Sequence, residues 1–176
     1  PDDRDDVPDI DMSTWMAGLE LPSPVLTASG CAAAGRELDQ FFDITQIGGI
    51  VTKSVMLNPR SGRATPRMAE TPSGMLNSIG LANVGVHTFV KEKLPYLAQF
   101  DTKIIANIAA SSLEEYRDVL ELIEQHAVPN LAGYEINVSC PNVKDGGLSF
   151  GTSVERTEEL TRLLRGSTDR ALIIKL

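Results

Sequence analysis

Residues 134–142 of the chain read Tyr-Glu-Ile-Asn-Val-Ser-Cys-Pro-Asn, a stretch that predicts a buried strand ending in polar side chains. Because side chains alternate along a strand, Asn137 at its end and Cys140 and Asn142 just beyond it can converge on one pocket. Amide side chains offer hydrogen-bond donors and acceptors, and a thiolate can take up a proton. This combination favours chemistry on a planar, hydrogen-bonding ring over chemistry on a peptide or a phosphate ester.

Short apolar runs rich in Val and Ile alternate with polar or amphipathic segments along the rest of the chain. The expected strands lie at residues 24–28, 49–55, 103–109, 134–139 and 171–176. The expected helices lie at residues 35–42, 88–97, 112–126 and 153–164, the last two beginning with Ser112 and Ser153 as N-caps. Regular alternation of strand and helix predicts a parallel sheet, either open or closed as a (β/α)8 barrel.

Polar residues at or just after the ends of the expected strands favour the barrel. These residues are Ser29, Lys53, Asn107, Asn137 and Lys175. Barrel enzymes collect their catalytic groups at the carboxyl ends of their strands. We therefore predict an α/β fold of the (β/α)8 TIM-barrel type.

The longest connection, residues 56–86, is rich in Pro and Gly and is expected to fold over the mouth of the barrel. Within it, Asn77-Ser-Ile-Gly-Leu81 combines an amide with a run of backbone N–H groups, one of them from a glycine that permits close approach. Such a segment can bind a carboxylate. Nearer the N-terminus, residues 12–21 are expected to form a small hairpin that closes the bottom of the barrel.

Composition limits the classes of function. The chain has 176 residues, of which 42% are hydrophobic and 23% charged, which predicts one globular domain with a sizeable core. The net charge of -8 argues against nucleic acid or an anionic membrane as a partner. The aspartates crowded into residues 1–11 predict a disordered acidic tail, with the single domain at residues 12–176.

The sequence shows no clear targeting segment and no metal-binding motif. No stretch approaches the length of a membrane span, and the acidic start is unlike a signal peptide, so we expect a cytoplasmic protein. Cys31 and Cys140 are far apart in sequence and are expected to be free thiols. His87 and His126 lack metal-ligand spacing, so no metal site is predicted.

Several segments together resemble dihydroorotate dehydrogenase and, more narrowly, the catalytic subunit of its NAD-linked, two-subunit class 1B. They are residues 28–31, 51–54, 65–81, 105–108, 137–147 and 173–176, in the expected order from about Met12 onward. The resemblance implies an oxidoreductase acting on a CH–CH bond. It would oxidise (S)-dihydroorotate to orotate in de novo pyrimidine (UMP) biosynthesis, with FMN as its cofactor.

The resemblance also implies a role for each matching residue. Cys140 would be the base that removes a proton from the substrate ring. The residues that would contact FMN are Ser29, Lys53, Ser54, Asn107, Asn137 and Lys175. The residues that would contact the substrate are Lys53, Asn77, Ser78, Ile79, Gly80, Leu81, Asn137 and Asn142.

The family implies a partner. Electrons would pass from FMN to an electron-transfer subunit that carries FAD and a two-iron two-sulfur cluster, and then to NAD. This chain has 2 cysteines and cannot supply the four thiolates of such a cluster itself. The implied assembly is a heterotetramer of two catalytic and two electron-transfer subunits.

The length of the chain leaves alternatives open. A full barrel needs about 250 residues, and the chain ends within the fifth expected strand, so we expect a barrel truncated there. The chain could then be an inactive fragment that binds no flavin. It could also be the FMN domain of a dihydropyrimidine dehydrogenase, which likewise places a Cys after Asn-x-Ser. The sequence after Cys140 and the loop at Asn77 favour the orotate enzyme.

Overall fold

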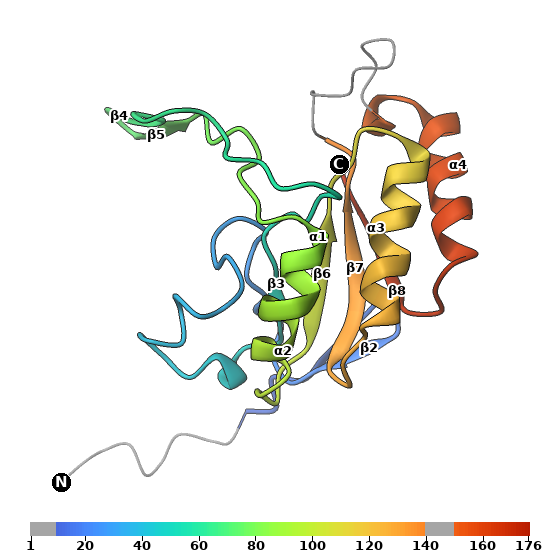
Figure 1. The fold of residues 1–176 in the computed structure, drawn as a ribbon. Helices are drawn as coiled ribbons and strands as arrows, with labels where there is room; N and C mark the ends of the chain where they lie inside the picture. The colour runs from blue at the N-terminus through green and yellow to red at the C-terminus, as the bar shows by residue number, and fades with distance from the viewer. Residues whose placement is uncertain (1–9, 140–149) are drawn as a thin grey trace, which may run out of the picture.

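The centre of the structure, a computed structural model that describes residues 10–139 and 150–176, is a parallel sheet of four strands (Figure 1). The strands stand in the order β3-β6-β7-β8, and each neighbouring pair is parallel. They are β3 (Ile50–Val51), β6 (Ile104–Ile108), β7 (Leu131–Asn137) and β8 (Ala171–Lys175). Parallel strands added in chain order and joined by helices form the wall of a TIM-type α/β fold.

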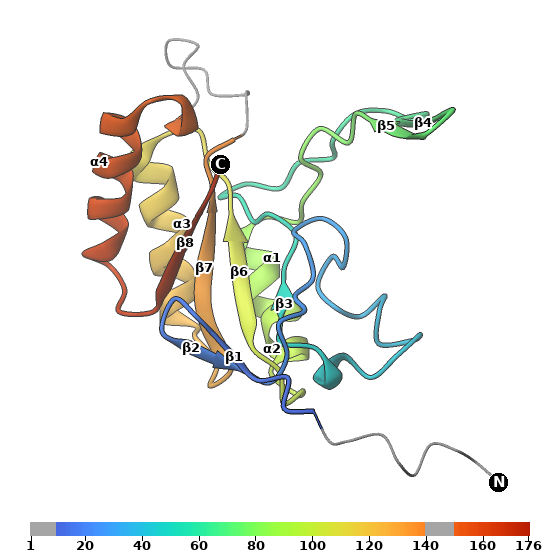
Figure 2. The same cartoon turned by 180° about the vertical axis from the view of Figure 1, so that it is seen from behind.

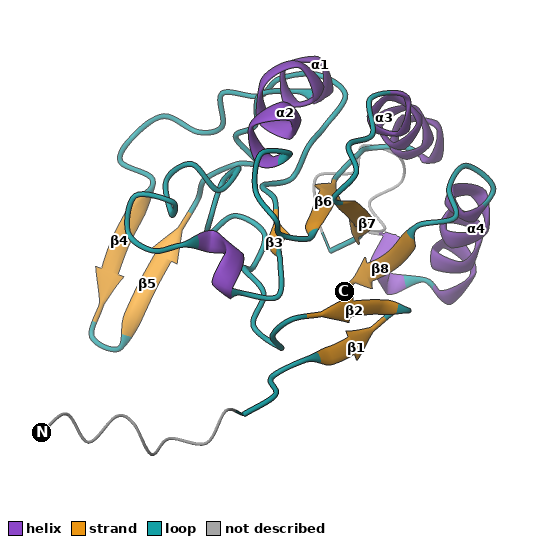
Figure 3. Cartoon of the chain, turned by 90° about the horizontal axis from the view of Figure 1, so that it is seen from below, coloured by secondary structure: helices purple, strands orange, loops and turns teal. Residues whose placement is uncertain are grey.

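The helices cover one face of this sheet (Figure 3). The first helical segment consists of α1 (Val86–Thr88), the π-helical turn η3 (Phe89–Lys93) and α2 (Leu94–Leu97). The longer helices are α3 (Leu113–Gln125) and α4 (Val154–Arg165), and the short 3-10 helices are η2 (Ile44–Gln46) and η4 (Phe150–Thr152). The face without helices is called the inner face below.

The two longer helices begin where the sequence predicts. The Ser112 side chain accepts a hydrogen bond from the Glu115 N–H at 3.2 Å, and the Ser153 side chain accepts one from the Arg156 N–H at 3.3 Å. These bonds satisfy backbone donors that a helix leaves unpaired in its first turn. Helix α3 then buries residues 116, 119, 120 and 123 at the spacing of an amphipathic helix.

The hydrophobic core lies between the helices and the sheet. Ile104, Ala106 and Ile108 of β6 belong to this core, as do Tyr134 and Ile136 of β7. Because side chains alternate along a strand, the residues between them face the other way. The packing of the core therefore turns the alternate residues of β6 and β7 toward the inner face.

A hairpin precedes the sheet, as predicted for residues 12–21. Strands β1 (Thr14–Met16) and β2 (Leu19–Leu21) pair antiparallel. The two residues of the turn, Ala17 and Gly18, have φ values of 50° and 80°, the conformation that suits the twist of a two-residue hairpin. Figures 1 and 2 show the hairpin at the amino-terminal end of the sheet, where the bottom of a barrel lies.

Two predicted elements are absent. Residues 24–28 form only an isolated parallel bridge between Leu26 and Gly49, because the Thr27 hydroxyl, and not its backbone, takes the hydrogen bond from the Val51 N–H. Residues 35–42 form successive turns and not a helix. Gly35 itself is not helical, with a φ of 84°, and the Leu38 N–H donates to Gly35 O and the Phe41 N–H to Leu38 O, which are the short-range bonds of turns.

The connection at residues 56–86 forms a second hairpin, β4 (Met68–Thr71) and β5 (Gly74–Asn77), whose strand residues are all exposed. Figures 1 and 2 show this hairpin extending away from the sheet. The connection was predicted to fold over the mouth of the barrel, whereas the hairpin pairs only with itself among the described strands and extends away from the sheet.

Among the described residues, no helix is long and apolar enough to cross a membrane.

Candidate functional site

Four polar residues meet on the inner face near the carboxyl edge of the sheet. Asn107 of β6 is in register with Glu135 of β7, and Asn137 of β7 is in register with Lys175 of β8. Side chains in register on one face of a sheet are direct neighbours. We call Asn107, Glu135, Asn137 and Lys175 the inner-face cluster.

Asn107 is fully buried, with 0% of its surface exposed. Its side-chain amide nitrogen, Nδ2, donates to Oε1 of Glu135, and its backbone N–H donates to Oγ1 of Thr52 at 3.2 Å. Its side-chain oxygen, Oδ1, accepts from no group among the described residues. A buried carbonyl oxygen left without a donor costs about 1–3 kcal/mol, so this atom marks a place for a ligand N–H.

Asn137 presents the opposite group. Its Oδ1 accepts hydrogen bonds from Oγ of Ser139 at 2.8 Å and from the Ser139 N–H at 3.3 Å. Its backbone oxygen accepts from the hydroxyl of the buried Tyr116 at 2.6 Å. Because Oδ1 is engaged, the amide nitrogen is the group that Asn137 can offer to a ligand, and a nitrogen donor suits a carbonyl oxygen. Asn107 and Asn137 together fit a ring edge that carries both N–H and C=O, as the flavin and orotate rings do.

Lys53 and Ser54 follow β3 and lie beside the end of β6. The backbone N–H of Thr52 donates to Ile105 O at 3.0 Å, and that of Val55 donates to Asn107 O at 2.8 Å, so the two residues between them run past Asn107. Ser54 is buried and Lys53 is half-buried. Within residues 10–139 and 150–176, Lys53 forms no ion pair.

The loop that carries Ser29 and Gly30 lies against Lys53. The Lys53 N–H donates to Ala33 O at 2.7 Å, and a Cβ added at Gly30 would lie 3.5 Å from the Lys53 ammonium nitrogen. Gly30 has a φ of 92°, which a glycine adopts without strain. Ser29 is half-buried in the same loop. The structure therefore brings the loop of Ser29 together with Lys53 and Ser54.

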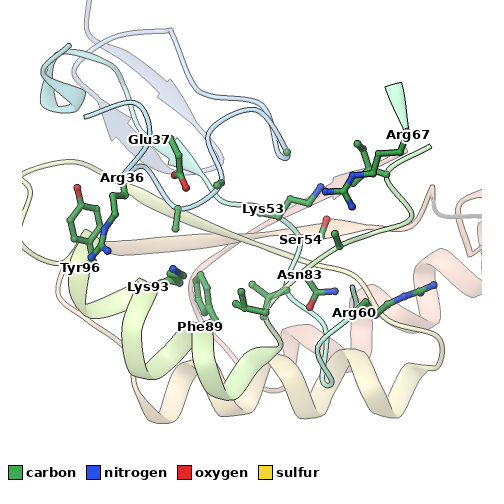
Figure 4. A pocket seen from close by; sticks show the side chains of 17 residues that line it. Arg36, Glu37, Lys53, Ser54, Arg60, Arg67, Asn83, Phe89, Lys93 and Tyr96 are labelled. Atoms are coloured by element: carbon green, nitrogen blue, oxygen red, sulfur yellow. The ribbon is translucent and has the colours of Figure 1, made fainter. Parts of the chain in front are cut away.

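A pocket of about 540 Å³ opens beside Lys53 (Figure 4). Among the described residues, its cationic lining residues are Arg36, Lys53, Arg60, Arg67 and Lys93, and its acidic lining residue is Glu37. Figure 4 shows the Lys53 and Arg67 side chains pointing toward each other at one end of the pocket. An excess of positive charge in a concave site attracts anions.

Only part of the predicted carboxylate-binding segment reaches this pocket. Ile79 lines it, whereas Asn77 and Ser78 are exposed on the projecting hairpin. The Ser78 N–H donates to Arg67 O at 2.8 Å and is therefore engaged within the hairpin. Gly80 and Leu81 have φ values of 73° and 54°, which turn the chain back toward Asn83.

Asn83, which the sequence analysis did not select, holds the base of this loop. Its Oδ1 accepts from the Gly85 N–H at 3.0 Å, and its Nδ2 donates to Leu81 O at 2.8 Å. Its backbone exchanges hydrogen bonds of 2.9 Å with Arg60. The sequence feature that could have predicted this role is an Asn two residues before a Gly, a pattern typical of turns that a side chain stabilises. Glu135 and Arg67 were also missed, although Glu135 lies two residues from Asn137 and so shares its face.

Cys140 and Asn142 lie outside the described residues, as does most of the predicted acidic tail. Cys31 is an exposed free thiol. Among the described residues, no group of three or more His, Cys, Asp or Glu side chains could hold a metal ion.

The parallel sheet fits a TIM-type α/β fold, and the polar side chains of the candidate site gather at its carboxyl edge, where such folds carry their sites. The chain belongs to the dihydroorotate dehydrogenase family, whose family model matches residues 11–176.

Relatives narrow the class within this family. The "Dihydroorotate dehydrogenase B (NAD(+)), catalytic subunit" of Geotalea daltonii is 47% identical over 166 residues, which cover 94% of this chain and 54% of the relative. The protein of the same name from Geobacillus sp. (strain WCH70) is 48% identical over 165 residues, which cover 94% of this chain and 52% of the relative. These relatives confirm the predicted resemblance to the class 1B catalytic subunit. The chain spans about half the length of the curated relatives it matches.

A solved structure shares the fold. The DHODH of Eimeria tenella, determined in complex with ferulenol, superposes with a TM-score of 0.70 at 16% sequence identity. The match covers 89% of this chain and 44% of that chain.

Proposed function

We propose that this chain forms the FMN-binding and dihydroorotate-binding part of an NAD-linked dihydroorotate dehydrogenase, which oxidises (S)-dihydroorotate to orotate in UMP biosynthesis. The observation that carries the proposal is the buried Oδ1 of Asn107, which lacks a donor among the described residues and lies beside Asn137. The relatives support the orotate enzyme over a dihydropyrimidine dehydrogenase, because their names state that activity.

The residues of the inner face fit FMN. Asn107 would accept from a ring N–H and Asn137 would donate to a ring carbonyl, while Lys53 and Lys175 would place positive charge beside the ring, where it favours the reduced, anionic state. Ser29 and Ser54 would add hydroxyl contacts. FMN, when bound, supplies the acceptor for the hydride that leaves the substrate.

The substrate would be held by its charge and by its amide edge. Dihydroorotate is an anion, and the cationic lining beside Lys53 is suited to its carboxylate. Of the predicted segment 77–81, Ile79 lines this pocket and its backbone would complete the carboxylate site. Asn137 and Asn142 would bind the polar edge of the ring. The role of Asn142 is proposed from the sequence motif that contains it.

Cys140 would take the proton. As a thiolate it would remove a proton from one ring carbon while the neighbouring carbon loses a hydride, so that a carbon–carbon double bond forms between them. A free thiol has a pKa of about 8.5, and cations beside a thiol favour the thiolate. This assignment rests on the position of Cys140 directly after Asn137-Val138-Ser139 in the sequence.

We further propose that the chain corresponds to the N-terminal portion of a (β/α)8 barrel, since it matches about half of each relative. Electrons would leave through a partner subunit that carries FAD and a two-iron two-sulfur cluster and would reach NAD there, in a heterotetramer of two subunits of each kind. The name "catalytic subunit" of the relatives supports the existence of a partner.

The test is a comparison of the two cysteines. Cys140→Ser should bind FMN normally but slow its anaerobic reduction by dihydroorotate in stopped-flow absorbance, most strongly near neutral pH, because a hydroxyl is a poor base. The matched control is Cys31→Ser, which changes an exposed thiol and should reduce at the wild-type rate. Equal reduction rates in the two variants would contradict the assignment of Cys140.

A further inference from the structure

Glu135 is an acidic residue in the middle of β7 with no role in the chemistry described above. It is half-buried on the inner face, in register between Asn107 of β6 and Ile173 of β8. Within the described part of the chain it forms no ion pair. Placing a carboxylate inside a sheet is unfavourable unless the carboxylate is hydrogen-bonded. Among the described residues, Glu135 accepts a hydrogen bond from the Asn107 amide.

This bond fixes the direction of the Asn107 amide. An ionised carboxylate can only accept hydrogen bonds, whereas an amide donates on one side and accepts on the other. The side of Asn107 that faces Glu135 must therefore be Nδ2. The flipped amide would set Oδ1 of Asn107 against Oε1 of Glu135, two acceptors with no hydrogen between them. As a result Oδ1 points away from Glu135, buried and without a donor among the described residues.

We propose that Glu135 is a positioning residue, which orients Asn107 so that its Oδ1 accepts a hydrogen bond from the ring N–H of bound FMN. The inference rests on the proposed function. The pyrimidine ring of oxidised flavin has a single N–H between two carbonyls, so a site that reads this edge needs an acceptor at that point. An asparagine that was free to flip would present a donor there about as often as an acceptor.

A different role for Glu135 would be purely electrostatic. Lys175 lies diagonally across from it on β8, two residues beyond its register partner, and Lys53 lies beside the end of β6. If Glu135 served only to balance these charges, its removal would change FMN binding whether or not Asn107 was present. The two roles therefore separate in a double-mutant cycle.

The experiment measures the Kd for FMN by flavin fluorescence in the wild-type chain, Glu135→Leu, Asn107→Leu and the double variant. Each single variant should weaken binding by about 10-fold, the usual effect of one hydrogen bond to a buried group. In the Asn107→Leu background, Glu135→Leu should add a factor of less than about 2, because there is no amide left to orient. The visible absorption band of bound FMN should shift equally in both single variants and no further in the double variant.

Two further variants serve as controls for the effect of Glu135→Leu. Glu135→Gln keeps the shape of the side chain but accepts either amide orientation, so its Kd should fall between those of the wild type and Glu135→Leu. Glu159→Leu removes an exposed carboxylate from α4 and should leave the Kd unchanged. Multiplicative effects of the two single variants, or no effect of Glu135→Leu, would overturn the inference alone. A wild-type chain that bound no FMN would overturn the proposed function as well.

Discussion

Replacing Gly133 with alanine should destabilise the protein, because the backbone of β8 occupies the space that a side chain would need. Gly133 in β7 lies opposite Ala171 in β8. A Cβ at Gly133 would lie 2.7 Å from Ala171 O and 2.9 Å from Ala171 Cβ. Two carbon atoms pack best at about 3.5–4.0 Å, so the contact between the two Cβ atoms is too short by roughly 0.6 Å. The obstacle is backbone and cannot rotate away, so β8 itself would have to move.

The expected cost follows from two opposing effects. Overpacking of a well-packed site costs about 1–3 kcal/mol. Replacing Gly by Ala also restricts the unfolded chain, which returns about 0.4–1 kcal/mol. Gly133→Ala should therefore lower the free energy of unfolding by about 1–2 kcal/mol.

The assay is urea unfolding followed by circular dichroism, with Gly74→Ala as the matched control. The Cβ at Gly74 would find its nearest atom, Thr71 Oγ1, at 3.8 Å, so the same substitution meets no obstacle there. Gly74→Ala should stay within about 0.5 kcal/mol of the wild type. If Gly133→Ala were as stable as Gly74→Ala, the close approach of β7 and β8 would be refuted.

Two further predictions concern the loop at Lys53 and the start of α3. Gly30→Ala should weaken FMN binding in a fluorescence titration, because alanine disfavours a φ of 92° and would shift the loop that lies against Lys53. Gly18→Ala has the same kind of backbone strain at a φ of 80°, but it lies in the hairpin β1–β2 and should leave the Kd unchanged. Equal Kd values for the two glycine variants would place Gly30 outside the site. Ser112→Ala should lower the free energy of unfolding in urea by about 1 kcal/mol, because it removes the N-cap of α3. The neighbouring control, Ser111→Ala, should lower it by less than about 0.5 kcal/mol. Equal losses of stability in the two variants would show that the loss does not come from the cap.

The sheet was predictable because its strands are encoded locally. The runs at residues 103–109 and 171–176 are apolar on both faces over most of their length, as is typical of parallel strands, and residues 134–139 alternate between apolar and polar side chains. Each run overlaps a strand of the structure. The caps at Ser112 and Ser153 were equally local, since a hydroxyl ahead of an amphipathic segment is sufficient to predict them.

The elements that were missed depend on single residues or on distant parts of the chain. Residues 35–42 form turns closed by short-range hydrogen bonds, although their composition allows a helix. Thr27 pairs with Val51 through its side chain, which no hydrophobic pattern reveals. The turn at the base of the hairpin β4–β5 is held by hydrogen bonds of the Asn83 side chain, which no periodicity within the hairpin reveals.

The same distinction holds for the site. Asn107, Asn137 and Lys175 were found together because the carboxyl ends of neighbouring parallel strands meet at one edge. Glu135 was missed because it lies within a strand and not at its end. Arg36 and Arg67 were missed because they come from loops, and only the folded structure brings them to the pocket beside Lys53.

We propose that this chain carries the site at which dihydroorotate reduces FMN. The most direct test is to load the 176-residue chain with FMN, remove excess flavin and oxygen, and record the visible spectrum on addition of dihydroorotate. Flavin should remain bound, and its visible absorption should bleach as the substrate is oxidised. A chain that retained no flavin, or whose bound flavin kept its full absorption, would contradict the claim.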